Sequence, residues 1–195
     1  MKIRGKGVFQ SFMPSDEVPH PVGNDLDWNE SVVIYVWDVE QDVYIFFRIG
    51  HESNRGAHGL RVLWNNVRVP GKYYKKYEYQ DLRPEDKRKD GFGGGPTCTY
   101  TYDGKHHWTM VDGGVQVNLA MEDFHPGFGF WPAHAGTIVD DVARNHLEAS
   151  GLVSGIVRFN GAEYVLTNAV GYRDRSWGVR KWETMRAHTW IPVAF

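Results

Sequence analysis

Short runs of apolar and β-branched residues, each the length of a strand, recur along most of the chain. Residues 31–37 and 43–49 form two such runs, joined by a short polar turn. Their composition predicts a hairpin of two largely buried strands. The same pattern predicts strands at 60–69, 72–80, 97–103, 106–112 and 114–123. In the last of these, apolar residues alternate with polar ones, so one face of that strand is expected to be buried.

Turn residues separate these runs at regular intervals. Asp103-Gly104, Asp112-Gly113 and Asn160-Gly161 are dipeptides typical of tight hairpin turns. The last of them joins two further expected strands, at 152–161 and 162–172. No long amphipathic pattern appears, although residues 142–151 could form a short helix by propensity alone. The regular spacing of strands and turns predicts an all-β antiparallel barrel or sandwich.

Two segments break the pattern. Residues 11–30 contain several prolines and acids and are expected to be irregular. Residues 81–96 alternate charges and then become rich in glycine. That composition predicts a long mobile loop over one end of the sheet, with a lid as one interpretation of it.

The overall composition narrows the class of partner. The net charge is −2, so no strong attraction to nucleic acid or an anionic membrane is expected. Cys98 is the single cysteine, which rules out an intramolecular disulfide and fits a reducing compartment. The N-terminal residues lack the apolar core of a signal peptide, and no run approaches the length of a membrane helix. We expect a cytoplasmic protein that has no nucleic-acid partner and no stable membrane insertion.

The stretch 171–182 concentrates the chemistry of the chain. It contains three arginines, one carboxylate, one serine and two indoles, namely Arg173, Arg175, Arg180, Asp174, Ser176, Trp177 and Trp182. An arginine beside an aspartate can form a bidentate pair that holds the carboxylate ionised and oriented. Two interpretations are open: a structural salt-bridge cluster beneath a tryptophan, or a ligand or catalytic site.

A second pair of candidates precedes this stretch. If residues 145–149 form a strand, His146 and Glu148 face the same side. The pair could belong to an ordinary surface face, or it could serve as an acid/base pair. A carboxylic acid in an apolar pocket has a raised pKa and can act as a general acid.

Other kinds of site lack their sequence signals. The chain has 9 histidines, but none has the spacing of a metal site. A glycine-rich nucleotide loop followed by a helix is also missing. Ser176 with a histidine and an acid could form a triad, but no G-x-S-x-G elbow is present. We therefore expect no metal and no cofactor.

Residues 145–180 resemble the start of the second domain in the carotenoid 1,2-hydratase (hydroxyneurosporene synthase) superfamily, which includes AttH-like proteins. The resemblance rests on the order of an H-x-E segment, a V-x-G strand and a D-x-S-W-G core, here Asp174 to Gly178. Residues 48–56, RIGHESNRG, also resemble a loop in the first domain of bacterial relatives.

The resemblance implies two lipocalin-like barrels with an apolar ligand site in or between them. It implies a first domain at 1–140 and the beginning of a second at 141–195, and it makes 145–149 a strand. The second barrel would be incomplete, because about four strands are too few to close one. The chain also stops on an apolar run at 184–195, so we expect further sequence beyond Phe195.

The resemblance also implies a chemistry. Known members hydrate isolated alkenes in terpenoid chains or fold polyenes as pericyclases, without a required metal or nucleotide. Carotenoid hydratases have a histidine where this chain has Arg175, and this difference counts against carotenoid hydration in particular. We expect a cofactor-independent lyase or hydratase acting on a terpenoid, steroid-like or aromatic molecule. The alternatives are a non-catalytic carrier of lipophilic ligands and a pericyclase.

The expected roles are as follows. Asp174 would be the proton donor or an electrostatic anchor, held by Arg173 or Arg175, with Glu148 and His146 as secondary acid/base residues. Trp177 would form a pocket wall that stabilises positive charge. The remaining substrate-binding candidates are Arg175, Ser176, Arg173 and Trp182.

Overall fold

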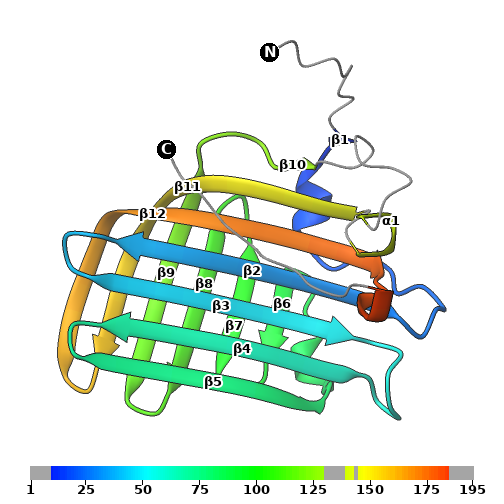
Figure 1. Ribbon diagram of the computed structural model, residues 1–195, viewed down its shortest axis with the longest axis horizontal. Helices are drawn as coiled ribbons and strands as arrows, with labels where there is room; N and C mark the ends of the chain where they lie inside the picture. Colours follow the sequence, from blue (N-terminus) through cyan, green and yellow to red (C-terminus); the bar gives the residue numbers. More distant parts are fainter. Residues whose placement is uncertain (1–9, 130–138, 143–144, 185–195) are drawn as a thin grey trace.

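The strands predicted from the apolar runs form in the structure. A computed structural model describes residues 10–129, 139–142 and 145–184 (Figure 1). Its strands are β1 (Gln10–Ser11), β2 (Trp28–Asp38), β3 (Val43–Glu52), β4 (Leu60–Val69), β5 (Lys72–Asp81), β6 (Gly91–Gly94), β7 (Cys98–Tyr102), β8 (His106–Asp112), β9 (Val115–Asp123), β10 (Phe128–Gly129), β11 (Asn145–Phe159) and β12 (Ala162–Val179). The short helical elements are η1 (Pro14–Glu17), η2 (Pro84–Asp86), α1 (Val139–Val142) and η3 (Trp182–Thr184).

The strands form one antiparallel sheet that curls into two layers. Its order is β5-β4-β3-β2-β12-β11-β9-β8-β7-β6, and β10 and β1 pair at the side of β11. In Figure 1, β2 to β5 lie in front with parts of β11 and β12, whereas β6 to β9 lie behind. β11 and β12 bend at one edge to join the layers, close to a register shift between Val153 and Gly155. The chain therefore has the predicted all-β, lipocalin-like fold, as a curled half-barrel.

The residues assigned to the start of a second domain lie within this sheet. β11 and β12 pair with each other, and they join β9 on one side to β2 on the other. A strand begins at Asn145 rather than a helix, as the family resemblance implied. The division into two domains at residue 140 stays a prediction, and it coincides with no break in the sheet. The apolar run at 185–195 lies outside the described residues.

The space between the two layers is filled by the hydrophobic core. Val32, Ile34 and Val36 on β2 are buried and belong to the same cluster as Trp108 on β8 and Leu119 on β9. This arrangement follows from the period of two along each strand, which turns alternate residues toward the core. We call the side of the front layer that is turned away from this core the outer face.

The glycine-rich segment that was expected to be a mobile lid is instead a buried strand. β6 pairs with β7, and all four of its residues are buried. A Cβ atom on Gly91 would lie 2.0 Å from the carbonyl oxygen of Tyr100. The lid interpretation is therefore wrong for this strand, because its glycines permit close packing rather than motion. Among the residues described, no helix is long and apolar enough to cross a membrane.

Candidate functional site

The central stretch 171–182 lies largely on β12, which divides its side chains between two faces. Successive residues of a strand point to opposite sides. Arg173 and Arg175 turn to the core side of the sheet, whereas Asp174 and Ser176 turn to the outer face. The expected pairing of Asp174 with either neighbouring arginine is therefore wrong.

Arg173 is part of a buried ion-pair cluster. Its guanidinium donates hydrogen bonds to Glu17 at 2.7 and 2.9 Å and to Asp123 at 2.9 Å. Burial alone would raise the pKa of Asp123, but hydrogen bonds from His106 and Arg173 and the charge of Arg173 lower it to about 2. The cluster links the N-terminal segment to β9 and β12. For Arg173, the interpretation of the stretch as a structural salt-bridge cluster therefore applies.

Arg175 lies two residues further along β12, on the same side of the sheet as Arg173. It donates a hydrogen bond to Glu30 at 2.7 Å, and its guanidinium lies 4.5 Å from the centre of the Phe92 ring. Trp177 stacks on His20 with ring centres 4.2 Å apart. Arg173, Arg175 and Trp177 were predicted to bind substrate. Because they lie on the core side of β12, they would not touch a ligand on the outer face.

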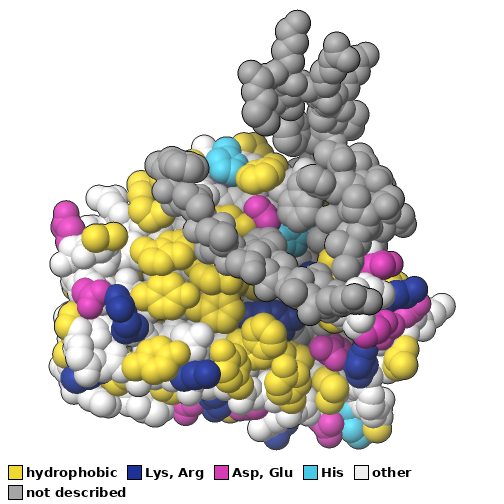
Figure 2. Space-filling model, in the orientation of Figure 1, with side chains coloured by type: hydrophobic (Ala, Val, Ile, Leu, Met, Phe, Trp, Pro, Cys, Tyr) yellow, Lys and Arg dark blue, Asp and Glu magenta, His cyan; other side chains and the backbone are white. Residues whose placement is uncertain are grey.

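A pocket of about 490 Å³ opens on the outer face. We call it the outer pocket. Its polar lining consists of Ser31, Arg48, Glu52, His146, Asp174, Ser176 and Arg180. Its apolar and aromatic lining consists of Val33, Tyr35, Phe46, Val62, Trp64, Tyr79, Val142 and Trp182. Figure 2 shows apolar side chains gathered on this face over the front strands, with Lys or Arg side chains beside them.

The pairing register explains why the surface is hollow here. Asp174 lies opposite Val33 on β2, and Val33 lies opposite Arg48 on β3. In the next outward row, Ser31 lies opposite Gly50. The floor between the acidic and basic sides therefore consists of small residues. Since neighbouring strands are about 4.8 Å apart, the Cα atoms of Asp174 and Arg48 are separated by about 10 Å.

Asp174 is a buried acid that faces this pocket. It is 8% exposed, and within the described chain no group donates a hydrogen bond to its carboxylate. Burial raises the pKa of Asp174, and the charge of His146 when that ring is protonated, together with the charge of Arg180, offsets only part of that effect. A buried carboxylic acid with a raised pKa is suited to donate a proton to a bound molecule.

His146 lies beside this acid and links two other predicted residues. Its Nδ1 is 2.6 Å from Ser176 Oγ, and its Nε2 is 2.9 Å from Glu148 Oε1. The prediction that His146 and Glu148 share one face is confirmed. When Glu148 is ionised, the Nε2–H group of His146 donates a hydrogen bond to it. His146 Nδ1 then accepts a hydrogen bond from the Ser176 hydroxyl.

This chain of residues differs from a nucleophilic triad in one respect. Ser176 lies inside a strand that is paired on both sides, with β11 and with β2. The backbone N–H groups beside it belong to the sheet ladder and do not form an oxyanion hole. The arrangement is better suited to moving protons than to acyl transfer.

Arg48 is a site residue that the sequence did not reveal. It is 9% exposed, and its Nη1 atom has no hydrogen-bond partner in the described structure. Its guanidinium lies 4.8 Å from the centre of the Trp64 ring. A Cβ atom on Gly50 would lie 2.7 Å from Nη1, so the glycine leaves room for the guanidinium. In the sequence, the only mark of Arg48 is that it is the single arginine in the apolar run 43–49.

Arg180 and Trp182 close one end of the pocket. Arg180 Nε donates a hydrogen bond to the carbonyl oxygen of Val142 at 2.7 Å, and the guanidinium lies 4.4 Å from the centre of the Trp182 ring. Burial, together with the charge of Arg48, lowers the pKa of Arg180 to about 9. Arg180 is therefore charged at neutral pH. Trp182, which was predicted to bind substrate, lines the pocket.

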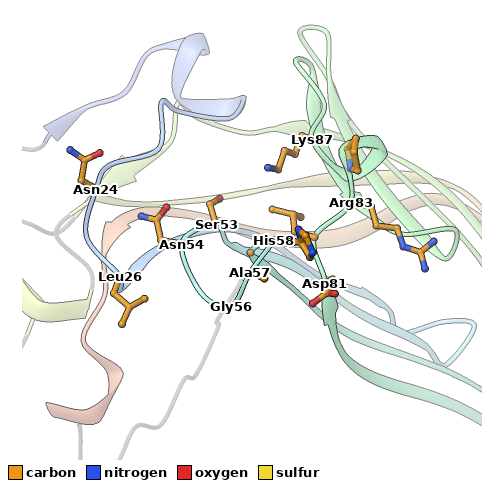
Figure 3. Close-up of a pocket in the computed structure, with 13 residues that line it drawn as sticks. Asn24, Leu26, Ser53, Asn54, Gly56, Ala57, His58, Asp81, Arg83 and Lys87 are labelled. Atoms are coloured by element: carbon orange, nitrogen blue, oxygen red, sulfur yellow. The ribbon is translucent and has the colours of Figure 1, made fainter.

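A second pocket of about 920 Å³ lies among the loops (Figure 3). It is formed mainly by the loop after β3 and the segment after β5. Its titratable lining residues, His58, Asp81, Arg83 and Lys87, are all exposed. Water competes for polar contacts at such positions, so the outer pocket is the better candidate site. Over the described ranges, no group of three His, Cys, Asp or Glu side chains is placed to hold a metal ion.

Comparison with known proteins assigns the chain to a family. Residues 13–195 match the model of the domain of unknown function DUF7064, so the chain belongs to that family. A crystal structure of an AttH candidate from Nitrosomonas europaea is similar in fold, with a TM-score of 0.64 and 12% sequence identity. The match covers 88% of this chain and 57% of that one. It supports the predicted resemblance at the level of the fold alone. No curated protein matches the chain.

Proposed function

We propose that this DUF7064 protein is a cofactor-independent lyase or hydratase that acts on a hydrophobic small molecule in the outer pocket. One observation carries the proposal. Asp174 is a buried acid with a raised pKa, it has no hydrogen-bond donor among the described residues, and it opens onto a pocket with aromatic walls. Adding water to an alkene requires a group that gives a proton to carbon, and the same group takes that proton back when water is removed.

The neighbouring residues provide the second half of the reaction. In hydration, Asp174 gives a proton to the substrate. The water that adds gives a proton to the Ser176 hydroxyl, which passes its own proton to His146 Nδ1. The Glu148 carboxylate orients His146 and stabilises its charged form. The reverse sequence removes water. Proton exchange with solvent returns both groups to their starting states, so atoms and charges balance without a cofactor.

The charges in the pocket indicate how the transition state is stabilised. A role for Trp177 beside a developing cation was expected, but Trp177 lies on the other side of the sheet. The guanidinium of Arg180 faces the pocket instead, and its charge acts on Asp174. A fixed positive charge favours negative charge developing on a substrate oxygen over a free carbocation. We therefore infer a double bond conjugated to a carbonyl group rather than an isolated alkene.

The proposal is tested with purified protein and a lipophilic extract of the host, compared by mass spectrometry. Wild type should change one compound by the mass of one water molecule, and Asp174→Asn should not. Asp81→Asn is the matched control, because that residue is exposed and lines the second pocket. It should behave as wild type. Full turnover in Asp174→Asn would overturn the assignment.

The same experiment separates the alternatives. A compound retained unchanged by every variant would indicate a carrier. A product of unchanged mass that survives Asp174→Asn would indicate a pericyclase, in which the shape of the pocket dominates. The cytoplasmic location expected from the sequence stays a prediction.

A further inference from the structure

We propose that the outer pocket binds a lipophilic carboxylic acid, whose carboxylate is held by Arg48. The inference deepens the proposed function. It rests on that function for the reaction, whereas the binding of the carboxylate is independent of it. It names the class of ligand and the residue that recognises it.

Arg48 presents an unsatisfied hydrogen-bond donor to the pocket. Arg48 is nine-tenths buried and lines the pocket, yet its Nη1 atom has no partner within the described residues. Burying a charged donor without a partner is costly, and native structures seldom leave one in that state. A carboxylate oxygen in the pocket would satisfy it with a charge-assisted hydrogen bond.

This donor is held in place before a ligand arrives. The guanidinium lies against the Trp64 ring, and it occupies the space that Gly50 leaves above β3. A positioned guanidinium loses little freedom when it binds, which favours affinity. The indole also shields it from water.

The charged side chains around the pocket also favour an anionic ligand. Arg48 and Arg180 both line the pocket. Two nearby acids already have partners. The carboxylate of Glu52, near Arg48, forms an ion pair with Arg55 Nε at 3.4 Å, and Glu148 is hydrogen-bonded to His146. Asp174 is the remaining acid, and burial favours its neutral form. The two guanidiniums therefore outnumber the unpaired carboxylates of the pocket, and this excess of positive charge favours a bound anion.

The rest of the ligand is apolar. The side chains between and around the two arginines include Val33, Tyr35, Phe46 and Tyr79. The volume of about 490 Å³ falls in the range of roughly 300–1,000 Å³ that is usual for small-molecule sites. Asp174 lies two strands from Arg48, so it would reach an atom several bonds away from the carboxylate.

The test measures binding rather than turnover. The probes are 11-(dansylamino)undecanoic acid and its methyl ester, which differ in charge but share the same tail. Fluorescence titrations at pH 7.5 compare wild type, Arg48→Met and Arg68→Met. Met keeps much of the apolar length of arginine without its charge. Arg68 is an exposed arginine on the adjacent strand and serves as the control.

Wild type and Arg68→Met should bind the acid about tenfold or more tightly than the ester. Arg48→Met should lose that preference while it still binds the ester. Gly50→Ala, with folding checked by circular dichroism, should weaken the preference by displacing the guanidinium. Equal binding of acid and ester by wild type would overturn the inference, and so would a preference that survives in Arg48→Met.

The outcomes also separate this inference from the proposed function. A preference for the acid combined with an unchanged host extract would support the carboxylate site and indicate a carrier. Turnover that depends on Asp174 without any preference for the acid would indicate a neutral substrate and overturn the inference.

Discussion

Replacing Asp174 by asparagine should stabilise the protein at alkaline pH. The two side chains have nearly the same shape, so the change removes charge and little else. The native carboxylate is 8% exposed and accepts no hydrogen bond from the described residues. Its oxygens reach water only through the outer pocket, and the hydration lost by a mostly buried charged group costs about 1–3 kcal/mol. The charges of Arg48 and Arg180 offset part of that cost, so we expect a net gain of about 1 kcal/mol at pH 8.

The gain should depend on pH in a defined direction. The folded pKa of Asp174 is raised above its ordinary value of 3.8 because burial disfavours the charged form. The native state therefore binds this proton more tightly than the unfolded state does. The stabilisation from this proton is complete at pH values below the ordinary pKa of 3.8, and it is lost as the pH rises through the folded pKa. The advantage of Asp174→Asn should appear above that pH and vanish toward pH 4.

Thermal unfolding of wild type, Asp174→Asn and Asp81→Asn between pH 4 and 8 would measure this effect. A change of 1 kcal/mol shifts Tm by about 2–4 °C in a domain of this size. Asp81→Asn should follow wild type throughout. A loss of stability in Asp174→Asn at pH 8 of about 3–5 kcal/mol would refute the reasoning, because a loss of that size is typical of breaking a buried ion pair.

Three further changes test other parts of the structure. Gly91→Ala should destabilise the fold by about 1–3 kcal/mol in urea unfolding, because the added methyl group clashes with the Tyr100 carbonyl; an unchanged midpoint would contradict the buried position of β6. Asp123→Asn should cost about 2 kcal/mol at pH 7, since the lowered pKa of Asp123 stabilises the fold above its ordinary 3.8. That difference should shrink as the pH falls toward 2, and a constant difference would contradict it. Ser176→Ala should keep turnover within about tenfold by mass spectrometry, whereas a nucleophilic serine would lose about a thousandfold or more.

Local patterns were sufficient to predict the class of fold. The alternation at 115–121 and the Asp-Gly and Asn-Gly dipeptides predicted strands and hairpins that form as β7, β8, β9, β11 and β12. The sequence was also sufficient to predict that His146 and Glu148 lie together, because residues two apart on a strand share one face.

The two halves of the central stretch were harder to separate. Composition grouped Arg173, Asp174 and Arg175 as one cluster, but a continuous strand through them turns the arginines and the carboxylate to opposite faces. Their partners lie far away in the sequence. Arg173 bonds Glu17, which is 156 residues distant, and no local rule identifies such a contact.

The other mistaken interpretation came from composition as well. A run of glycines predicted mobility at 91–94, whereas tertiary packing uses these glycines to bring β6 close to its neighbours. Arg48 was missed for the related reason that one arginine in a strand is ordinary. It becomes informative only once its burial and its unpartnered atom are known.

The most direct test of the central claim follows the proton that Asp174 would deliver. Wild type, Asp174→Asn and Asp81→Asn are incubated with a lipophilic host extract in D₂O, and exchangeable deuterium is then washed out. Mass spectrometry measures the deuterium left on carbon. We predict deuterium on one compound with wild type and Asp81→Asn, and none with Asp174→Asn. Labelling that persists in Asp174→Asn, or a hydrated product of wild type that carries no deuterium on carbon, would contradict the account.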